Sequence, residues 1–216
     1  MVLRLADQLD VPLRDRNPLL LAAGFAPSYA ERSLDDPDMA AVRGAIDRIL
    51  AGYEPYPALV VDRGWNLVAG NSSVALLTTG AAPDLVQPPV NVLRLSLHPR
   101  GMAGKIVNLA QWRGHVLDRL TREAAATGAT DLVELHRELA GYPGGVEHAA
   151  HDTAVAVPLR LRAGEQELAF ISTVTTFGTA VDITAAELSI EAFLPADSIT
   201  SRSLHDTASA PADSPR

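Results

Sequence analysis

The stretch Pro57–Asn71, PALVVDRGWNLVAGN, decides the fold of this chain. Two short runs rich in β-branched and apolar residues flank Asp62-Arg63-Gly64, a sequence typical of a tight turn. Two such runs about one turn predict a β-hairpin.

Three further strands are expected in the last third of the chain. Apolar residues alternate with their neighbours over 155–162 and again over 188–194, and the segment 166–176 is long and rich in β-branched residues. Thr184 and Glu187 also fit a capping box, which would begin a helix. Four clean alternations outweigh that two-residue motif, so we predict a strand here.

Helical spacing of apolar residues separates the hairpin from these strands and also precedes the hairpin. The helix that begins at Asp36-Pro37 has the position of a connector. Asn17-Pro18 could act as an N-cap and first helical residue, which would shorten the second helix to 18–23. The expected helices are 2–9, 12–24, 37–52, 106–120 and 132–139.

The order hairpin, helices, three strands predicts an α+β domain over residues 53–197. The last strand can return beside the first, because consecutive antiparallel elements close into one sheet with helices on one face. This is a PAS-like, five-stranded antiparallel sheet preceded by short N-terminal helices. The predicted division is 1–30, a connector helix at 31–52, the PAS-like domain at 53–206 and a disordered tail at 207–216.

Composition excludes several classes of protein and site. A net charge of −8 with a single lysine, Lys105, excludes a nucleic-acid surface spread over the whole molecule. The absence of cysteine excludes disulfides, thiolate catalysis and thiolate metal sites. No apolar run is long enough to span a membrane, and early charged residues break any signal peptide, so we expect a cytoplasmic protein.

Signatures of catalysis and metal binding are also missing. The sequence has no Gly-x-Ser-x-Gly elbow, phosphate-binding glycine loop or His-Glu-x-x-His pair, so we expect no enzyme activity and no cofactor. Glu147, His148, His151 and Asp152 have metal-ligand side chains, but they follow a glycine-rich loop that holds coordination geometry poorly. We therefore interpret this segment as a solvated loop without a metal.

Several long stretches resemble the MmyB-like family of bacterial transcription regulators, over nearly the whole chain. They are PLRDRNPLLLAAGFAPSY (12–29), EPYPALVVDRGWNLVAGN (54–71), NVLRLSLHPRG (91–101), VNLAQWRGHVL (107–117) and ELAFISTVTTFGTAVDITAAELSIEAFLPAD (167–197). The resemblance implies a helix-turn-helix domain similar to that of lambda repressor, followed by a PAS-like domain that holds a fatty acid or similar apolar molecule.

The N-terminus resembles only the last two helices of that DNA-binding domain. The recognition helix, which reads bases in the major groove, is expected upstream of Met1. Residues 1–30 contain as many aspartates as arginines, so attraction of this segment to phosphate is cancelled. They are Arg4, Arg14 and Arg16 and Asp7, Asp10 and Asp15. We expect DNA binding only through a complete upstream helix-turn-helix.

An apolar ligand pocket is expected where the helices meet the sheet. The low aromatic fraction, 5%, and abundant alanine indicate an interior that is not completely filled. Arg94 and His98 are candidate contacts for a polar head group, although helix-surface and capping roles are common for such residues. The candidate lining residues are Trp65, Leu67, Leu95, Val107, Trp112, Phe170, Val174 and Ile190.

An alternative function needs no ligand. The helix from Met39 to Leu50 could serve as a self-association surface, which would make the protein a dimerisation or protein-interaction module of PAS type and a possible homodimer. A lipid that co-purifies with the protein would distinguish the two functions. If Phe170 lines the pocket, Phe170→Ala should weaken lipid retention in a domain that still folds.

Overall fold

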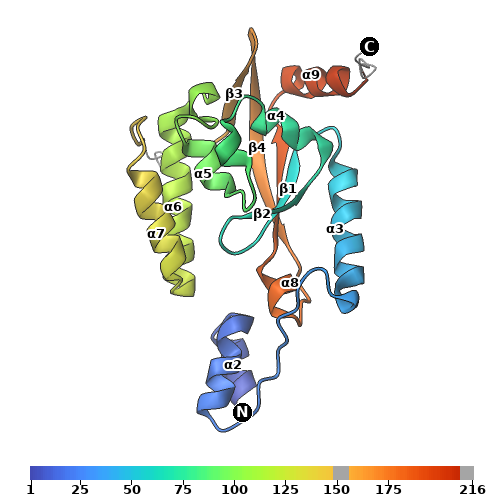
Figure 1. The fold of residues 1–216 in the computed structure, drawn as a ribbon, viewed down its shortest axis with the longest axis vertical. Helices are drawn as coiled ribbons and strands as arrows, with labels where there is room; N and C mark the ends of the chain where they lie inside the picture. The colour runs from blue at the N-terminus through green and yellow to red at the C-terminus, as the bar shows by residue number, and fades with distance from the viewer. Residues whose placement is uncertain (148–155, 210–216) are drawn as a thin grey trace.

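The computed structural model describes residues 1–147 and 156–209, which contain a five-stranded antiparallel sheet (Figure 1). The strand order is β2-β1-β5-β4-β3, so the last strand lies beside the first. This confirms the predicted α+β, PAS-like arrangement. The strands are β1 (Ala58–Val61), β2 (Leu67–Gly70), β3 (Leu159–Ala163), β4 (Gln166–Thr176) and β5 (Ser189–Pro195).

The predicted hairpin is formed by β1 and β2. One side-chain oxygen of Asp62 accepts hydrogen bonds from the backbone N–H groups of Gly64 and Asn66, each at 2.8 Å. Trp65 completes the turn with a left-handed backbone, φ 65°. A tryptophan seldom adopts this conformation, so the surrounding contacts must hold it there.

Helices cover both faces of the sheet, whereas the sequence predicted helices on one face only; Figure 1 shows α6 and α7 on one side and α3 on the other. The helices are α1 (Val2–Gln8), α2 (Leu13–Ala22), α3 (Ala40–Tyr53), α4 (Ala75–Thr78), α5 (Val92–Leu97), α6 (Leu109–Thr127), α7 (Thr130–Ala140), α8 (Ile183–Glu187) and α9 (Ser198–Ser209). Short 3₁₀ turns are η1 (Pro37–Met39), η2 (Ser72–Val74), η3 (Pro83–Val86) and η4 (Ala103–Lys105). Among the described residues, none of these helices is long and apolar enough to cross a membrane.

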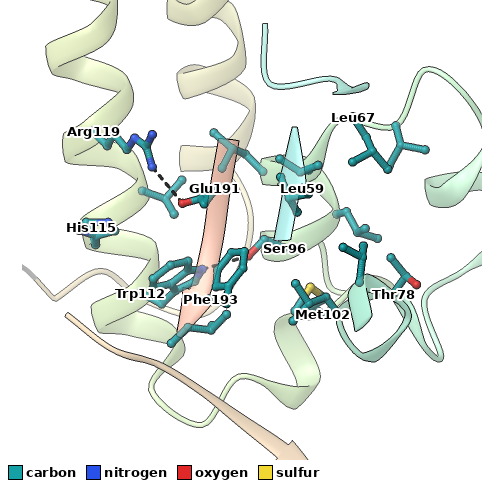
Figure 2. Close-up of a pocket in the computed structure, with 18 residues that line it drawn as sticks. Leu59, Leu67, Thr78, Ser96, Met102, Trp112, His115, Arg119, Glu191 and Phe193 are labelled. Carbon is teal, nitrogen blue, oxygen red and sulfur yellow. Dashed lines mark hydrogen bonds and ion pairs between the residues drawn. The ribbon is translucent and has the colours of Figure 1, made fainter. Parts of the chain in front are cut away.

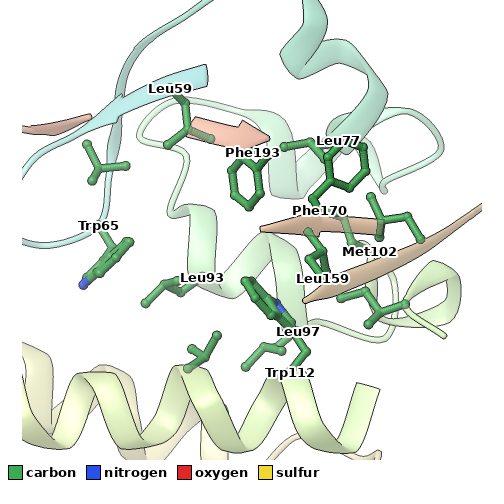
Figure 3. Packing of buried hydrophobic residues seen from close by; sticks show 14 of the residues in the cluster. Leu59, Trp65, Leu77, Leu93, Leu97, Met102, Trp112, Leu159, Phe170 and Phe193 are labelled. Carbon is green, nitrogen blue, oxygen red and sulfur yellow. The ribbon is translucent and has the colours of Figure 1, made fainter. Parts of the chain in front are cut away.

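Two hydrophobic clusters lie on opposite faces of the sheet. The larger one joins the sheet to α4–α7 and contains both tryptophans, Phe170 and Phe193 (Figure 3). The smaller one joins α3, through Ile46 and Leu50, to short aliphatic side chains of β1 and β5. The helix expected as a connector therefore contributes to the core on the second face.

Several boundaries differ from those predicted. α8 exists, because the Asp182 side chain, not Thr184, accepts from the first backbone N–H groups of the helix. α2 continues through Pro18. β3 begins only after Pro158, and Val155 lies outside the described residues. α9 was not predicted; it replaces the start of the expected tail as far as Ser209.

The N-terminal helical pair contacts the sheet domain at α8. Arg14 of α2 donates from Nε to Glu187 Oε1 at 2.6 Å and also pairs with Glu31. The backbone N–H of Ile183 donates to the Ala30 carbonyl at 2.8 Å. Residues 1–30 are thus attached to the short helix that leads directly into β5.

Candidate ligand cavity

A cavity of about 50 Å³ lies between the sheet and helices α4–α6 (Figure 2). Its wall is predominantly aliphatic and aromatic, as in sites for small molecules. The apolar lining residues are Leu59, Leu67, Val74, Leu77, Val90, Val92, Leu93, Leu95, Met102, Trp112, Val116, Leu159 and Phe193.

The stretch LSLHPRG ends α5 and returns the chain to the cavity. His98 follows the last helical residue, and its Nδ1 accepts from the Arg100 N–H at 3.0 Å. A Cβ on Gly101 would collide with the Leu95 carbonyl oxygen, so only glycine fits this close approach. The turn then places the next residue, Met102, in the cavity wall.

Arg119 and Glu191 are the oppositely charged residues of the cavity wall. Arg119 Nη1 donates to Glu191 Oε1 at 3.1 Å, and its Nε donates to Glu123 Oε1 at 2.9 Å. Ser172 Oγ donates to the same Glu191 oxygen at 2.6 Å. A charged pair of which one member, Glu191, is 5% exposed gives an otherwise apolar cavity one polar end.

Trp65 holds this polar end from the hairpin. Its indole Nε1 donates to Glu123 Oε2 at 2.9 Å, and the Arg119 guanidinium lies 4.2 Å from the centre of its ring. Cation–π stacking and the shared Glu123 fix the guanidinium in place. The left-handed turn of the hairpin therefore positions a residue of the polar end.

His115 and Ser96 add neutral polar groups. Burial lowers the pKa of His115 below its ordinary value of 6.5, and the positive charges of Arg119 and Arg122 lower it further. The imidazole stacks on Trp112, whose Nε1 donates to Ser96 Oγ at 3.0 Å. At neutral pH the wall carries this histidine mainly in its uncharged form.

The structure brings together only part of the predicted lining. Leu67, Leu95 and Trp112 line the cavity. Phe170 is fully buried in the same cluster without facing the cavity, and Trp65 lines a second hollow, toward α2.

Three predicted lining residues lie elsewhere. Val107 is 38% exposed and Val174 is 44% exposed. Ile190 is on the opposite face, in the α3 cluster, because successive residues of a strand point to opposite faces. Its neighbours Glu191 and Phe193 take the cavity side.

The predicted head-group contacts also lie outside this cavity. Arg94 forms two hydrogen bonds of 2.7 Å with the Glu138 carboxylate of α7, and His98 packs edge-on against Tyr142. The Arg94 hydrogen bonds lower the pKa of Glu138 to about 2, and Tyr142 contributes to the same shift. Arg94 therefore joins α5 to α7, and Arg119, which the sequence analysis did not single out, is the cation at the cavity.

The segment considered above as a possible metal site lies mostly outside the described residues, so its interpretation as a solvated loop stays a prediction. Glu147 is exposed, while His148, His151 and Asp152 lie outside the described residues. In 1–147 and 156–209, no group of three or more His, Asp or Glu side chains could hold a metal ion.

The chain is similar to a solved structure and to a protein-family model. A solved structure of an RsLOV variant has a TM-score of 0.35 and 16% identity, covering 77% of this chain and 75% of that one. No curated protein matches the chain. Residues 42–206 match the family model described as the MmyB-like transcription regulator ligand binding domain. The chain therefore belongs to the MmyB-like transcription regulator family, and the match falls on the ligand-binding domain of that family.

Proposed function

We propose that this domain senses an apolar small molecule with a fatty-acid-like alkyl body and that the bound state modulates DNA binding by a helix-turn-helix unit. The observation that carries the proposal is the apolar cavity between the sheet and α4–α6, in a family defined by ligand binding. Its aliphatic wall suits an alkyl chain through the hydrophobic effect.

The cavity in this structure is the closed form of the proposed site. A void of about 50 Å³ accommodates only a few water-sized groups. An alkyl chain must therefore displace side chains of the wall, and Met102 is suited to this because methionine is unbranched and flexible. Ligand binding is expected to enlarge the cavity.

A route from the cavity to the N-terminal helices supports the regulatory part of the proposal. Glu191 and Phe193 of β5 line the cavity, and α8 directly precedes β5 in the chain. Arg14 ties α2 to Glu187 at the end of α8. A shift of β5 that accompanies ligand entry would therefore act on the segment that carries residues 1–30.

The alternative function, a ligand-free dimerisation module, was expected to use the helix from Met39 to Leu50 as its surface, and three apolar side chains of that helix are buried. Met39, Ile46 and Leu50 are buried within the chain, and the last two pack against β1 and β5. The apolar face of α3 is therefore not available to a second copy. A homodimer through another surface, the absence of enzyme activity and a cytoplasmic location stay predictions.

Mass spectrometry of denatured, freshly purified protein tests the ligand. We expect an apolar small molecule with an alkyl chain to be released in stoichiometric amount. A preparation without such a molecule, which also fails to bind added alkyl compounds, would contradict the proposal.

Fluorescence anisotropy with operator DNA at physiological salt tests the regulatory part. We expect the 216-residue chain alone to show no sequence-specific affinity, because residues 1–30 form only the two helices α1 and α2, which we interpret as the end of a helix-turn-helix unit without its recognition helix. A chain extended upstream through such a unit should bind, and its affinity should change when ligand is added. Specific binding by the 216-residue chain would overturn this interpretation of its N-terminus.

A further inference from the structure

One carboxylate oxygen at the cavity has no donor among the described residues. Both hydrogen bonds to the Glu191 side chain, from Arg119 and Ser172, reach Oε1. No described residue donates to Oε2, although Glu191 is 5% exposed and lines the cavity. Oε2 is therefore an open acceptor at the cavity, and a ligand donor placed here would form a hydrogen bond to a charged group.

The Arg119 guanidinium also has a donor, Nη2, without an acceptor among the described residues. Arg119 donates from Nε to Glu123 and from Nη1 to Glu191. Its Nη2 donates to no described residue, and the stacked Trp65 ring holds the guanidinium in place. The polar end of the cavity therefore presents one free acceptor and one free donor.

The charge at this end disfavours an anion. Glu191 and Glu123 together carry two negative charges against the one positive charge of Arg119, while the charges of Arg122 and Asp118, which also act on His115, cancel. His115 adds no compensating charge at neutral pH, because burial disfavours its protonated form. A ligand carboxylate would have to approach a site with a net charge of about −1, where the low dielectric strengthens repulsion.

We propose that the ligand of this cavity has an uncharged head group that both donates and accepts, a hydroxyl or a primary amide, on an alkyl chain. The head group would donate to Glu191 Oε2 and accept from Arg119 Nη2. This inference rests on the proposed function, since it assigns the head group of the alkyl ligand proposed above. It predicts selection against the carboxylate of the same chain length.

A titration at pH 7.5 with 1-dodecanol, dodecanamide and dodecanoate, each below its aggregation concentration, tests the inference. Both tryptophans of the chain, Trp65 and Trp112, contact the polar end or wall, so their fluorescence reports binding. Dodecanoate is ionised at this pH. We expect the alcohol and the amide to bind at least about tenfold more tightly than the carboxylate.

Glu191→Gln should remove this selectivity. The variant takes away one negative charge and offers an amide donor, so dodecanoate should gain affinity relative to dodecanol. Glu165→Gln, which makes the same charge change at an exposed turn, is the matched control and should keep the wild-type order.

The wild-type titration distinguishes failure of the head-group inference from failure of the proposed alkyl-binding function. If dodecanoate binds the wild-type protein as tightly as dodecanol, the head-group inference is overturned while the alkyl-binding function stands. If none of the three compounds binds, both the inference and the proposed function fail. The wild-type comparison alone is decisive even if Glu191→Gln does not fold.

Discussion

The two faces of the sheet are both covered by helices, but they are filled differently. The face under α3 uses mainly small and aliphatic side chains, such as Ala58, Val60 and Ile190. The face under α4–α7 uses two tryptophans and two phenylalanines and includes the buried carboxylate of Glu191.

The difference explains why this cavity lies on the α4–α7 face. Small aliphatic side chains of similar size close against one helix and leave little space. Large rings and a hydrogen-bonded ion pair cannot interdigitate so completely, because each ring and each polar group needs its own geometry. The α3 face supplies stability, whereas the α4–α7 face combines stability with a candidate site.

The largest effect should come from Phe170, which belongs to the cavity face but is fully buried. Phe170→Ala should lower the free energy of unfolding by about 4 kcal/mol, because it removes a whole ring from a packed core. Urea denaturation measures this value. A loss under about 1 kcal/mol, with weakened dodecanol binding, would instead make Phe170 a residue of the ligand site.

Leu50 tests the opposite face. Leu50→Ala should lower the free energy of unfolding by about 3 kcal/mol through the cavity it leaves under α3. Affinity for dodecanol, measured at a temperature where the variant is folded, should stay within about twofold of the wild type. A larger change in affinity would show that the two faces are coupled through the sheet.

The sequence predicts the sheet well because its signals are local. Alternation and the Asp62-Arg63-Gly64 turn suffice for the hairpin, and the order of elements then leaves few ways to pair the strands. The prediction lacks the helices α8 and α9 and begins β3 too early; at α8 a short capping signal competes with alternation over a few residues.

The cavity is harder to predict, because the sequence does not say which face of β5 meets which helix. Alternation predicts that Leu188, Ile190 and Ala192 face the helices that line the cavity, yet they lie under α3, and Glu191 and Phe193 face the cavity. Nothing local marks Arg119 rather than Arg94 as the cation near the ligand. A glutamate alternating with apolar residues in a strand covered on both faces was the one available signal.

A smaller effect is expected at Trp112, which bridges the cavity wall to Ser96. Trp112→Phe should cost about 1–2 kcal/mol, because it leaves the buried Ser96 hydroxyl without its indole donor. Adding Ser96→Ala should recover part of that loss, since both polar partners are then absent. Thermal unfolding of the single and double variants measures the difference, and equal losses would show that the hydrogen bond contributes nothing.

The smallest effect is a pH dependence of the cavity face, because His115 in the cavity wall is a titratable group. Its pKa in the folded protein is lowered from 6.5 by burial first and then by Arg119 and Arg122. The unfolded chain therefore binds a proton at higher pH than the folded chain does. Stability is fully present above about pH 7 and declines as the pH falls through 6.5 toward the lower folded value. His115→Gln should flatten this part of the profile, measured by urea denaturation between pH 8 and pH 5.5, with pH 8 as the internal reference. A variant whose stability falls as steeply as that of the wild type would place the titrating group elsewhere.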